Sequence, residues 1–504
     1  MSTIIETFTS GLLVFTQPEL LLYILGGLLF GMYAGAMPGI SATMAISLIV
    51  SLSYNWSIYP ALAVALGCYV GAVYGGSRSA ILLNVPGTPA AIATAFDGYP
   101  LAKQGKAAKA LGITAIQSVI GGIIGSIFLL VAAPLITRFA LMFASRDYFL
   151  LALMGIMLLV SMSGGSFTKG MFSGFLGMFI GVIGMDSSTA TQRFTFDNIY
   201  LMNGISSVAI IIGIFGLSES LVQMRDLRKV TVRKQDLSRI IPSFQDAFGY
   251  LRVTIESSLI GVFVGALPGT GGNIAALISY DRAKKSTKNP AVPFGEGAIE
   301  GLVASESSNN AAVGGAVIPM LTLGIPGDSA TALLLACMTA HGVVTGPTLI
   351  DSQDGIFGII VMLVLLANIF LLPVSLTGIK IFAKIVEVPK QILLPLIIVL
   401  ATVGSFAAKK NIMDVYFMAG FGVLGYFLSI HSFKTGPLVL GMILSQLLEL
   451  NLRRSLVAAY GSVWTLLGQM VSNTLSAVLT LVIVLVMLSQ FGILKKLKSV
   501  IKKS

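Results

Sequence analysis

The sequence is dominated by apolar segments of about 20 residues that contain few or no charged side chains. A helix of that length spans the hydrocarbon core of a bilayer. Charged residues make up only 11% of the 504 residues, whereas a soluble domain carries about 25%. The pattern therefore predicts an all-α polytopic membrane protein and argues against a soluble fold.

The positions of the basic residues predict how the chain lies in the bilayer. No Lys or Arg precedes Arg78, so the N-terminus lacks the positive region of a cleaved signal peptide. The basic residues behind the net charge of +11 lie in a few loops and in the tail 495–503. Because cytoplasmic loops retain Lys and Arg, we interpret this charge as a topology signal and not as a nucleic-acid surface. It predicts a cytoplasmic C-terminus and a periplasmic N-terminus.

Two motifs occur in the same order in each half of the chain. The segment 31–39, GMYAGAMPG, reappears as 261–269, GVFVGALPG, and 81–87, ILLNVPG, reappears as 321–327, LTLGIPG. Two matches in register indicate an internal repeat. We therefore predict a first half over residues 1–217, a basic cytoplasmic linker over 218–252, a second half over 253–450, and C-terminal membrane helices with a basic tail over 451–504.

The loops that follow the second motif carry opposite charge in the two halves. Lys103, Lys106 and Lys109 follow the first copy, whereas Asp351 and Asp354 follow the second. By the positive-inside rule the first loop is cytoplasmic and the second lies outside. The halves are thus expected to be inverted repeats.

Each motif ends in Pro-Gly within an apolar segment, and this pair breaks a helix. Broken backbone is tolerated in a bilayer only where it is buried in protein or lines a wet cavity. The segments that meet at 38–39 and 268–269 are short and resemble re-entrant helical hairpins. Other apolar segments are expected near 58–75, 80–96 and 412–430, among others. Paired interruptions in two halves are typical of the binding site of a transporter.

Small polar residues gather at these breaks. A helix N-terminus offers unpaired N–H groups and about half a positive charge, which suits a carboxylate, while opposing carbonyl ends suit a sodium ion. The alternative is that small residues simply let helices pack closely. The candidate substrate-binding residues are Ser41, Thr43, Arg78, Asn84, Thr88, Thr270, Gly271, Asn273, Asn310 and Ser329. The candidate cation-binding residues are Gly39, Pro86, Glu306, Asn309, Pro326 and Asp328.

Two charged residues lie close to these breaks. Arg78 stands in an apolar run, and a charge at mid-membrane costs about 2.5–3.5 kcal/mol, so the residue either holds an anionic substrate or extends to the membrane interface. Glu306 precedes the polar run 307–310 and follows a polar insertion, around 281–301, that only the second half carries between its two motifs. Glu306 either binds a cation or caps or orients this insertion. No catalytic residue, no cofactor and no metal other than sodium is expected.

The longest motif is also the most specific. Residues 81–90, ILLNVPGTPA, lead to 97–105, DGYPLAKQG. The accompanying motifs are GAMPG at 35–39, YGGS at 74–77, GALPG at 265–269, ESSNNAA at 306–312 and LTLGIPG at 321–327. With these motifs the chain resembles the large membrane subunit of the tripartite tricarboxylate transporters over nearly its whole length, to about residue 470.

The resemblance implies a bacterial secondary transporter in the inner membrane. In that family an extracytoplasmic solute-binding protein delivers a carboxylate, typically citrate, and a small membrane subunit of about four helices pairs with the permease. A cation gradient, commonly sodium, drives uptake. No P-loop is present, because Gly105-Lys106 lacks both the earlier glycine and the following Ser or Thr.

Two mechanisms remain open for such a permease. In an elevator, residues around 35–95 and 265–345 would slide against a scaffold of the remaining helices; rocking of the two halves about a fixed site is the rival. A small-anion channel and a membrane-embedded enzyme are the alternative functional classes.

Overall fold

The computed structural model describes residues 2–37, 40–162, 166–186, 189–225, 242–269, 271–350, 355–385 and 390–490. Helices make up nearly all the regular structure of these residues, and the strands among them are the two-residue β1 (Gly184–Met185) and β2 (Gln192–Arg193). The expected all-α class is therefore confirmed. Several predictions lie outside the described residues, namely those on Gly39, Thr270, Asp351, Asp354, the linker residues 226–241 and the tail 491–504.

Six helices of the described part are long and apolar enough to cross a membrane. They are α2 (Pro18–Ala36), α4 (Ile58–Leu83), α6 (Ala107–Ala140), α17 (Ile356–Ile385), α19 (Ile412–Ile430) and α20 (Thr435–Ala458). A further span is available if α21 (Val463–Gln469) and α22 (Thr474–Gln490), which are bent by 103° at a short break, cross together. The chain is thus a multi-pass membrane protein, as the sequence predicts.

Shorter elements connect these helices. Before residue 226 they are α1 (Ser2–Gly11), η1 (Leu12–Thr16), α3 (Ala42–Ser53), η2 (Pro89–Ala91), α5 (Ile92–Lys103), α7 (Ser145–Met162), α8 (Phe167–Gly181), α9 (Ile199–Met202), α10 (Ser207–Ile211), η3 (Ile212–Leu217) and α11 (Ser218–Gln223). After it they are α12 (Phe244–Phe248), α13 (Leu251–Gly265), α14 (Gly271–Ser286), α15 (Ile299–Leu323), α16 (Ser329–Ala340) and α18 (Lys390–Lys409). Helical structure runs across both 217/218 and 450/451, where we had placed segment boundaries.

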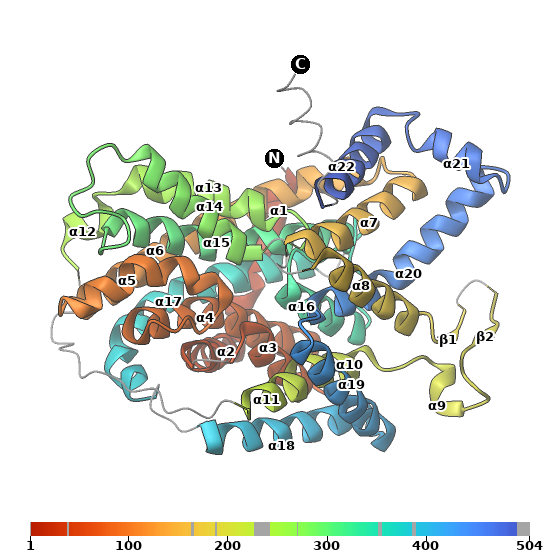
Figure 1. Ribbon diagram of the computed structural model, residues 1–504, viewed down its shortest axis with the longest axis horizontal. Coiled ribbons are helices and arrows are strands. Elements are labelled where there is room, and N and C mark those ends of the chain that lie inside the picture. Colours follow the sequence, from red (N-terminus) through yellow and green to blue (C-terminus); the bar gives the residue numbers. More distant parts are fainter. Residues whose placement is uncertain are drawn as a thin grey trace.

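The broken helices of both halves form the centre of the molecule. In Figure 1, α2, α3 and α4 lie below α13, α14 and α15, with α18 and α19 along the lower edge and α20 to α22 on the right. Helix α4 packs on α2, and α15 packs on α13, α14 and α6. Because α4 and α15 are buried along nearly their whole length, polar residues on them face protein and not lipid.

Glycines bring the central helices into backbone contact at equivalent places in the two halves. A Cβ at Gly31 of α2 would lie 2.2 Å from the carbonyl oxygen of Cys68 on α4, and a Cβ at Gly261 of α13 would lie 2.3 Å from that of Ser308 on α15. The same relation recurs one turn later, at Gly35 against Ala72 and at Gly265 against Ala312. The sequence repeat is therefore also a repeat of helix contacts.

Helix α4 corrects one expected segment boundary. We expected two apolar segments, 58–75 and 80–96, but α4 continues through Gly75 and Gly76 to Leu83. The glycines do not break the helix because they serve close packing: a Cβ at Gly75 would lie 2.6 Å from the carbonyl oxygen of Met32. The segment 412–430 is confirmed, since α19 has those bounds.

The breaks themselves begin in the same way in both halves. Asn84 ends α4 at φ 57°, and Gly324 ends α15 at φ 69°, both in the left-handed region. Glycine and, less often, asparagine are the residues that cap helices in this conformation. The structure thus gives Asn84 a backbone role, and its side chain is exposed.

Candidate substrate and cation site

The two Pro-Gly breaks of the second half lie against each other. The amide of Gly269 donates to the carbonyl oxygen of Gly327 over 2.8 Å. Helix α14 begins two residues after the first break and α16 two residues after the second, and a Cβ at Gly271 would lie 3.0 Å from Cβ of Asp328. The N-termini of α14 and α16 are therefore neighbours.

Asp328 caps one of these two N-termini. Its Oδ1 accepts the amide of Thr331 over 2.8 Å, while the Thr331 hydroxyl accepts the amide of Asp328 over 2.9 Å, which makes a capping box on α16. The other carboxylate oxygen, Oδ2, accepts the hydroxyl of Tyr69 on α4 over 2.6 Å. A negative charge thus stands beside the positive end of α16 and close to the start of α14.

Two neighbouring buried amide side chains of α15 lack hydrogen-bond partners among the described residues, and one of them approaches the start of α14. Asn309 and Asn310 of α15 are 1% and 0% exposed, and the side-chain oxygen and nitrogen of each have no hydrogen-bond partner among the described residues. The Oδ1 of Asn309 approaches α14, since a Cβ at Gly272 would lie 2.5 Å from it. An unpaired buried polar group costs about 1–3 kcal/mol, so these amides mark a place where a polar ligand would be stabilising.

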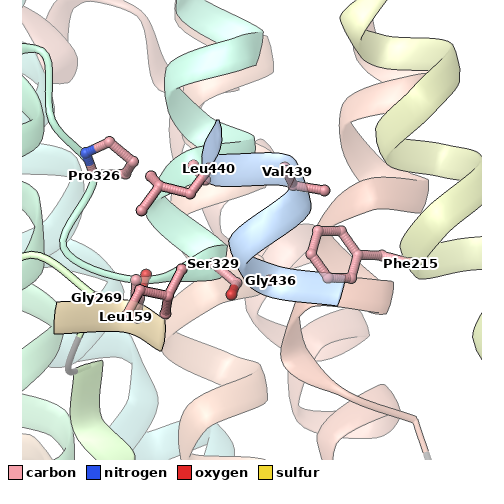
Figure 2. A pocket seen from close by; sticks show the side chains of 10 residues that line it. Leu159, Phe215, Gly269, Pro326, Ser329, Gly436, Val439 and Leu440 are labelled. Atoms are coloured by element: carbon pink, nitrogen blue, oxygen red, sulfur yellow. The ribbon is translucent and has the colours of Figure 1, made fainter. Parts of the chain in front are cut away.

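A small cavity of about 10 Å³ opens beside the break at Pro326. Figure 2 shows the Ser329 hydroxyl next to Gly436, with Leu159 close by and Phe215 on the other side. Its lining residues are Leu159, Phe215, Gly269, Pro326, Asp328, Ser329, Ala332, Gly436, Val439 and Leu440. This is about the space that one water molecule needs, so the cavity in this conformation is far too small for a tricarboxylate.

Glu306 is held in a separate cluster of hydroxyl groups. It is 0% exposed on α15. Ser77 of α4 donates to its Oε1 over 2.6 Å, Thr94 of α5 also donates to Oε1, and Ser118 of α6 lies 2.9 Å from Oε2. Four helices therefore meet at this carboxyl group.

The candidates of the first half lie at the corresponding breaks. Ser41 caps α3, accepting the amide of Met44 over 3.1 Å, and its hydroxyl lies 2.8 Å from that of Thr43. Thr88 is buried against Gly76. Helix η2, which follows the break at 86–87, packs on α14, and α16, which follows the break at 326–327, packs on α3. The second break of each half therefore lies beside the helix that follows the first break of the other half.

Arg78 is placed apart from the second-half break. The residue is 2% exposed, so its side chain does not extend to solvent. Its Nη2 donates to the carbonyl oxygen of Ser375 on α17 over 3.1 Å, and its guanidinium carbon lies 5.0 Å from the ring centroid of Tyr74. The candidates Asn84 and Asn273 are exposed and Pro86 is half-buried.

The sequence reasoning missed a carboxylate that joins the two halves. Asp97 of α5 is 0% exposed, and its Oδ1 accepts the amides of Gly295, Gly297 and Ala298 over 2.8–2.9 Å. It thereby fixes the polar insertion just before α15 begins. Asp97 belongs to the motif 97–105 that carries the family resemblance, but nothing in the sequence identified its partners.

A larger cavity, also missed, lies between α8, α16 and α20. It measures about 600 Å³, which is a typical size for a ligand cavity, and Asp186, Arg193 and Glu449 are among its lining residues. Arg193 pairs with both acids, and Arg453 does the same, with Nη2 2.9 Å from Asp186 Oδ2 and 2.7 Å from Glu449 Oε1. The cavity therefore has a paired, locally neutral charge cluster at its wall.

The fold and the broken helices define a class: a multi-pass helical membrane protein with the interior helix breaks of a transporter. Residues 21–440 match the family model described as the tripartite tricarboxylate transporter TctA family. The chain belongs to this family.

Two relatives from Agrobacterium vitis support the assignment. The chain is 33% identical over 481 residues to the "Uncharacterized 52.8 kDa protein in TAR-I ttuC' 3'region", and the match covers 95% of each chain. It is 38% identical over 201 residues to the "Uncharacterized protein in TAR-II ttuC' 3'region", which covers 40% of this chain and 83% of that relative. No solved structure matches the chain.

Proposed function

We propose that the chain is the permease subunit of a cation-coupled secondary transporter that imports tricarboxylates such as citrate, or related carboxylates. Its partners are an extracytoplasmic solute-binding protein, which delivers the substrate, and a small membrane subunit of about four helices. The coupling ion is sodium. Membership of the tripartite tricarboxylate transporter family supports the class of substrate and the three-part assembly.

The observation that carries the proposal is the meeting of α14 and α16 at the bond from Gly269 to Gly327. A helix N-terminus attracts a carboxylate. At the start of α14, the buried amide side chain of Asn309 approaches Gly272. Amide groups can donate to a carboxylate as well as accept. We assign one carboxylate group of the substrate to this position, with Asn310 as a second amide.

The coupling ion belongs beside the substrate for an electrostatic reason. Asp328 is close to the same helix start, so an anion bound there would lie near a negative charge. A sodium ion between them would relieve this repulsion and would make binding of the substrate depend on binding of the ion. Carboxylate and carbonyl oxygens suit hard cations, and the backbone around Pro326 supplies further carbonyl groups.

We propose an inverted-repeat architecture with re-entrant hairpins, and the equivalent glycine contacts in the two halves support the repeat itself. We propose that the chain lies in the bacterial inner membrane with a periplasmic N-terminus and a cytoplasmic C-terminus. Residues around 35–95 and 265–345 form the mobile unit of an elevator. Helices α2 and α13 move with this unit, because backbone contacts lock α2 to α4 and α13 to α15. Crosslinks between this unit and the remaining helices that leave transport intact would contradict the elevator and favour rocking.

The direct test is uptake of labelled citrate into cells that express the chain, its small partner and its binding protein, with and without a sodium gradient. Saturable uptake that requires sodium and the binding protein is the expected result. Uptake of another di- or tricarboxylate instead would keep the class and change the substrate. Failure to take up any carboxylate under any gradient would overturn the proposal.

Matched variants locate the site within that experiment. Asn309→Ala and Asn310→Ala remove side chains that have no hydrogen-bond partner among the described residues, so their melting temperatures should not fall while the substrate concentration at half-maximal uptake rises by about tenfold or more, the equivalent of 1.4 kcal/mol. Gly26→Ala, at an open position of α2, is the control. Unchanged uptake in both variants would place the site elsewhere.

A further inference from the structure

Glu306 is a buried carboxyl group whose hydrogen-bond partners are all hydroxyls, from Ser77, Thr94 and Ser118. No ion pair of the described residues includes it. An isolated ionised carboxylate in a protein interior is so costly that the group takes up a proton instead. The surroundings of Glu306 therefore favour its neutral form, unless a cation is bound.

Several charged and titratable side chains on the helices around α15 contact groups other than Glu306. On α4, Arg78 donates to Ser375 and stacks over Tyr74, and Tyr69 donates to Asp328 of α16. On α5, Asp97 accepts backbone amides, and on α6, Lys109 pairs with Asp246. On α13 and α14, Glu256 pairs with Arg282, and Asp281 pairs with Lys285. None of these contacts supplies Glu306 with a positive charge.

The hydroxyl contacts of the carboxyl group can be satisfied by a protonated acid. Its Oε1 faces two hydroxyl donors, Ser77 and Thr94, as a carbonyl oxygen with two lone pairs would. Its Oε2 faces one hydroxyl, Ser118 at 2.9 Å, and a serine hydroxyl accepts as readily as it donates. An Oε2–H group donating to Ser118 satisfies all three contacts.

A sodium ion fits this cluster less well. Sodium would require the hydroxyl oxygens to turn toward the metal, but Ser77 and Ser118 lie 2.6 Å and 2.9 Å from the carboxyl oxygens themselves. The contacts are those of direct hydrogen bonds, and oxygen atoms this close leave no space for an ion between them.

We propose that Glu306 is a proton-binding site of the permease in addition to the proposed sodium site. It is a neutral carboxylic acid in this conformation, and its proton is exchanged during transport. On release the Oε2–H bond breaks and the proton passes to water; binding reverses the step. Glu306 and Asn310 are four residues apart on α15 and thus on the same face, about one turn apart. The exchange part rests on the proposed function, because it places the proton beside the amides assigned to the substrate.

Infrared spectroscopy of the purified full-length chain tests the protonation without transport. At neutral pH the carbonyl stretch of a buried carboxylic acid should be present, should shift in D2O and should be missing in Glu306→Gln. Asp97→Asn is the control, because Asp97 is another fully buried carboxyl group outside the Glu306 cluster, and its loss should leave the band. Identical spectra for wild type and Glu306→Gln would overturn the proposal.

A second variant covers a failure of Glu306→Gln to fold. Ser118→Ala keeps the carboxyl group and removes the hydroxyl that faces Oε2, so the acid band should shift in frequency. A band that is unaffected by this change would belong to another residue and would contradict the assignment.

Transport in liposomes tests the exchange. For one proton, a pH gradient of one unit supports about a tenfold accumulation of substrate, and in Glu306→Gln this factor should fall to about one, while Ser79→Ala should retain it. An unchanged factor would mean that the proton is purely structural and would overturn the exchange. If the wild type takes up no carboxylate at all, the proposed function fails, and the infrared band still decides whether Glu306 holds a proton.

Discussion

The Ser77 hydroxyl donates to Oε1 of Glu306 over 2.6 Å, and this bond joins α4 of the first half to α15 of the second. Both residues are 0% exposed. Because the same carboxyl group also contacts α5 and α6, one side chain of α15 connects its helix to three helices of the first half.

Removing the Ser77 hydroxyl should therefore destabilise the protein. Ser77→Ala leaves a buried acceptor with one donor fewer, and we expect a loss of about 1–3 kcal/mol. Ser79→Ala is the matched control, because among the described residues the Ser79 hydroxyl bonds only within α4, to the Gly76 carbonyl oxygen. Thermal melting of the detergent-solubilised variants measures both; equal melting temperatures would show that the cluster adds no stability.

The glycine contacts predict that Gly→Ala substitutions at equivalent positions of the repeat destabilise the protein to a similar extent. Gly31→Ala and Gly261→Ala would each place a Cβ about 2.2–2.3 Å from a backbone carbonyl oxygen, and overpacking against backbone costs about 1–3 kcal/mol or more. At Gly26, where a Cβ meets nothing within 4 Å, the same change should instead stabilise α2 by about 0.5–1 kcal/mol. Expression level and melting temperature report the three variants. Tolerance at only one of the two equivalent sites would show that the halves pack differently.

Asp97 should control the order of the polar insertion before α15. Asp97→Ala removes the acceptor of three amides at Gly295, Gly297 and Ala298, and we expect a loss of about 3 kcal/mol or more, since bonds to charged groups contribute about 1.5–3 kcal/mol each. Asp97→Asn keeps one acceptor oxygen and should cost less. Limited proteolysis across 287–298 should become faster in the same order. The exposed Asp281→Asn serves as the control, and equal cleavage rates in all variants would refute the assignment.

A substitution at Asp328 should change the sodium dependence of uptake without unfolding the protein. Asparagine caps helices about as well as aspartate, so Asp328→Asn should keep α16 folded while it removes the charge assigned to sodium. We expect the sodium concentration for half-maximal uptake to rise by about tenfold or more, with a small change in melting temperature. Tyr69→Phe, which removes only the hydroxyl bonded to Oδ2, is the comparison. An unaltered sodium dependence in Asp328→Asn would exclude this residue from the ion site.

The contact between Lys109 and Asp246 predicts a pH dependence. Burial raises the pKa of Asp246, but the hydrogen bonds and the charge of Lys109, 2.8 Å away, together with Ser243, lower it below its ordinary value. The pair therefore stabilises the protein fully above the ordinary aspartate pKa of about 3.9 and loses this contribution as the pH falls through the lowered pKa. The effect is at most about 1 kcal/mol for a partly exposed pair. Melting profiles of wild type and Lys109→Met should differ at neutral pH and converge in acid; a constant difference would disprove the assignment.

The sequence predicted the helices and the breaks well because both depend on local chemistry. Apolar segments gave α19 its bounds, and the second-half motifs led to Gly271, Asp328 and Ser329, which the structure brings together or places around one small cavity. These residues follow Pro-Gly pairs directly, so chain connectivity alone keeps them near the breaks.

Contacts between distant segments could not be predicted in this way. Nothing near Ser77, Thr94 or Ser118 in the sequence shows that their hydroxyls meet at one carboxyl group. Arg78 illustrates the same limit: its charge was evident, but its partner Ser375 lies on α17, almost 300 residues away. At Asn84 the polar side chain suggested a ligand, whereas the backbone conformation at φ 57° accounts for the residue.

The backbone contact between α2 and α4 has a consequence for how motion in this protein can be observed. Gly31 and Gly35 of α2 lie against carbonyl groups of α4, and Gly67 and Gly71 of α4 lie against carbonyl groups of α2. Because glycines of both helices lie against the backbone of the other helix, neither helix can slide along the other unless the two helices first separate. A pair of spin labels on α2 and α4 should therefore give one narrow distance distribution in every state of the transport cycle. This pair can serve as the fixed reference against which the displacement of other helices is measured.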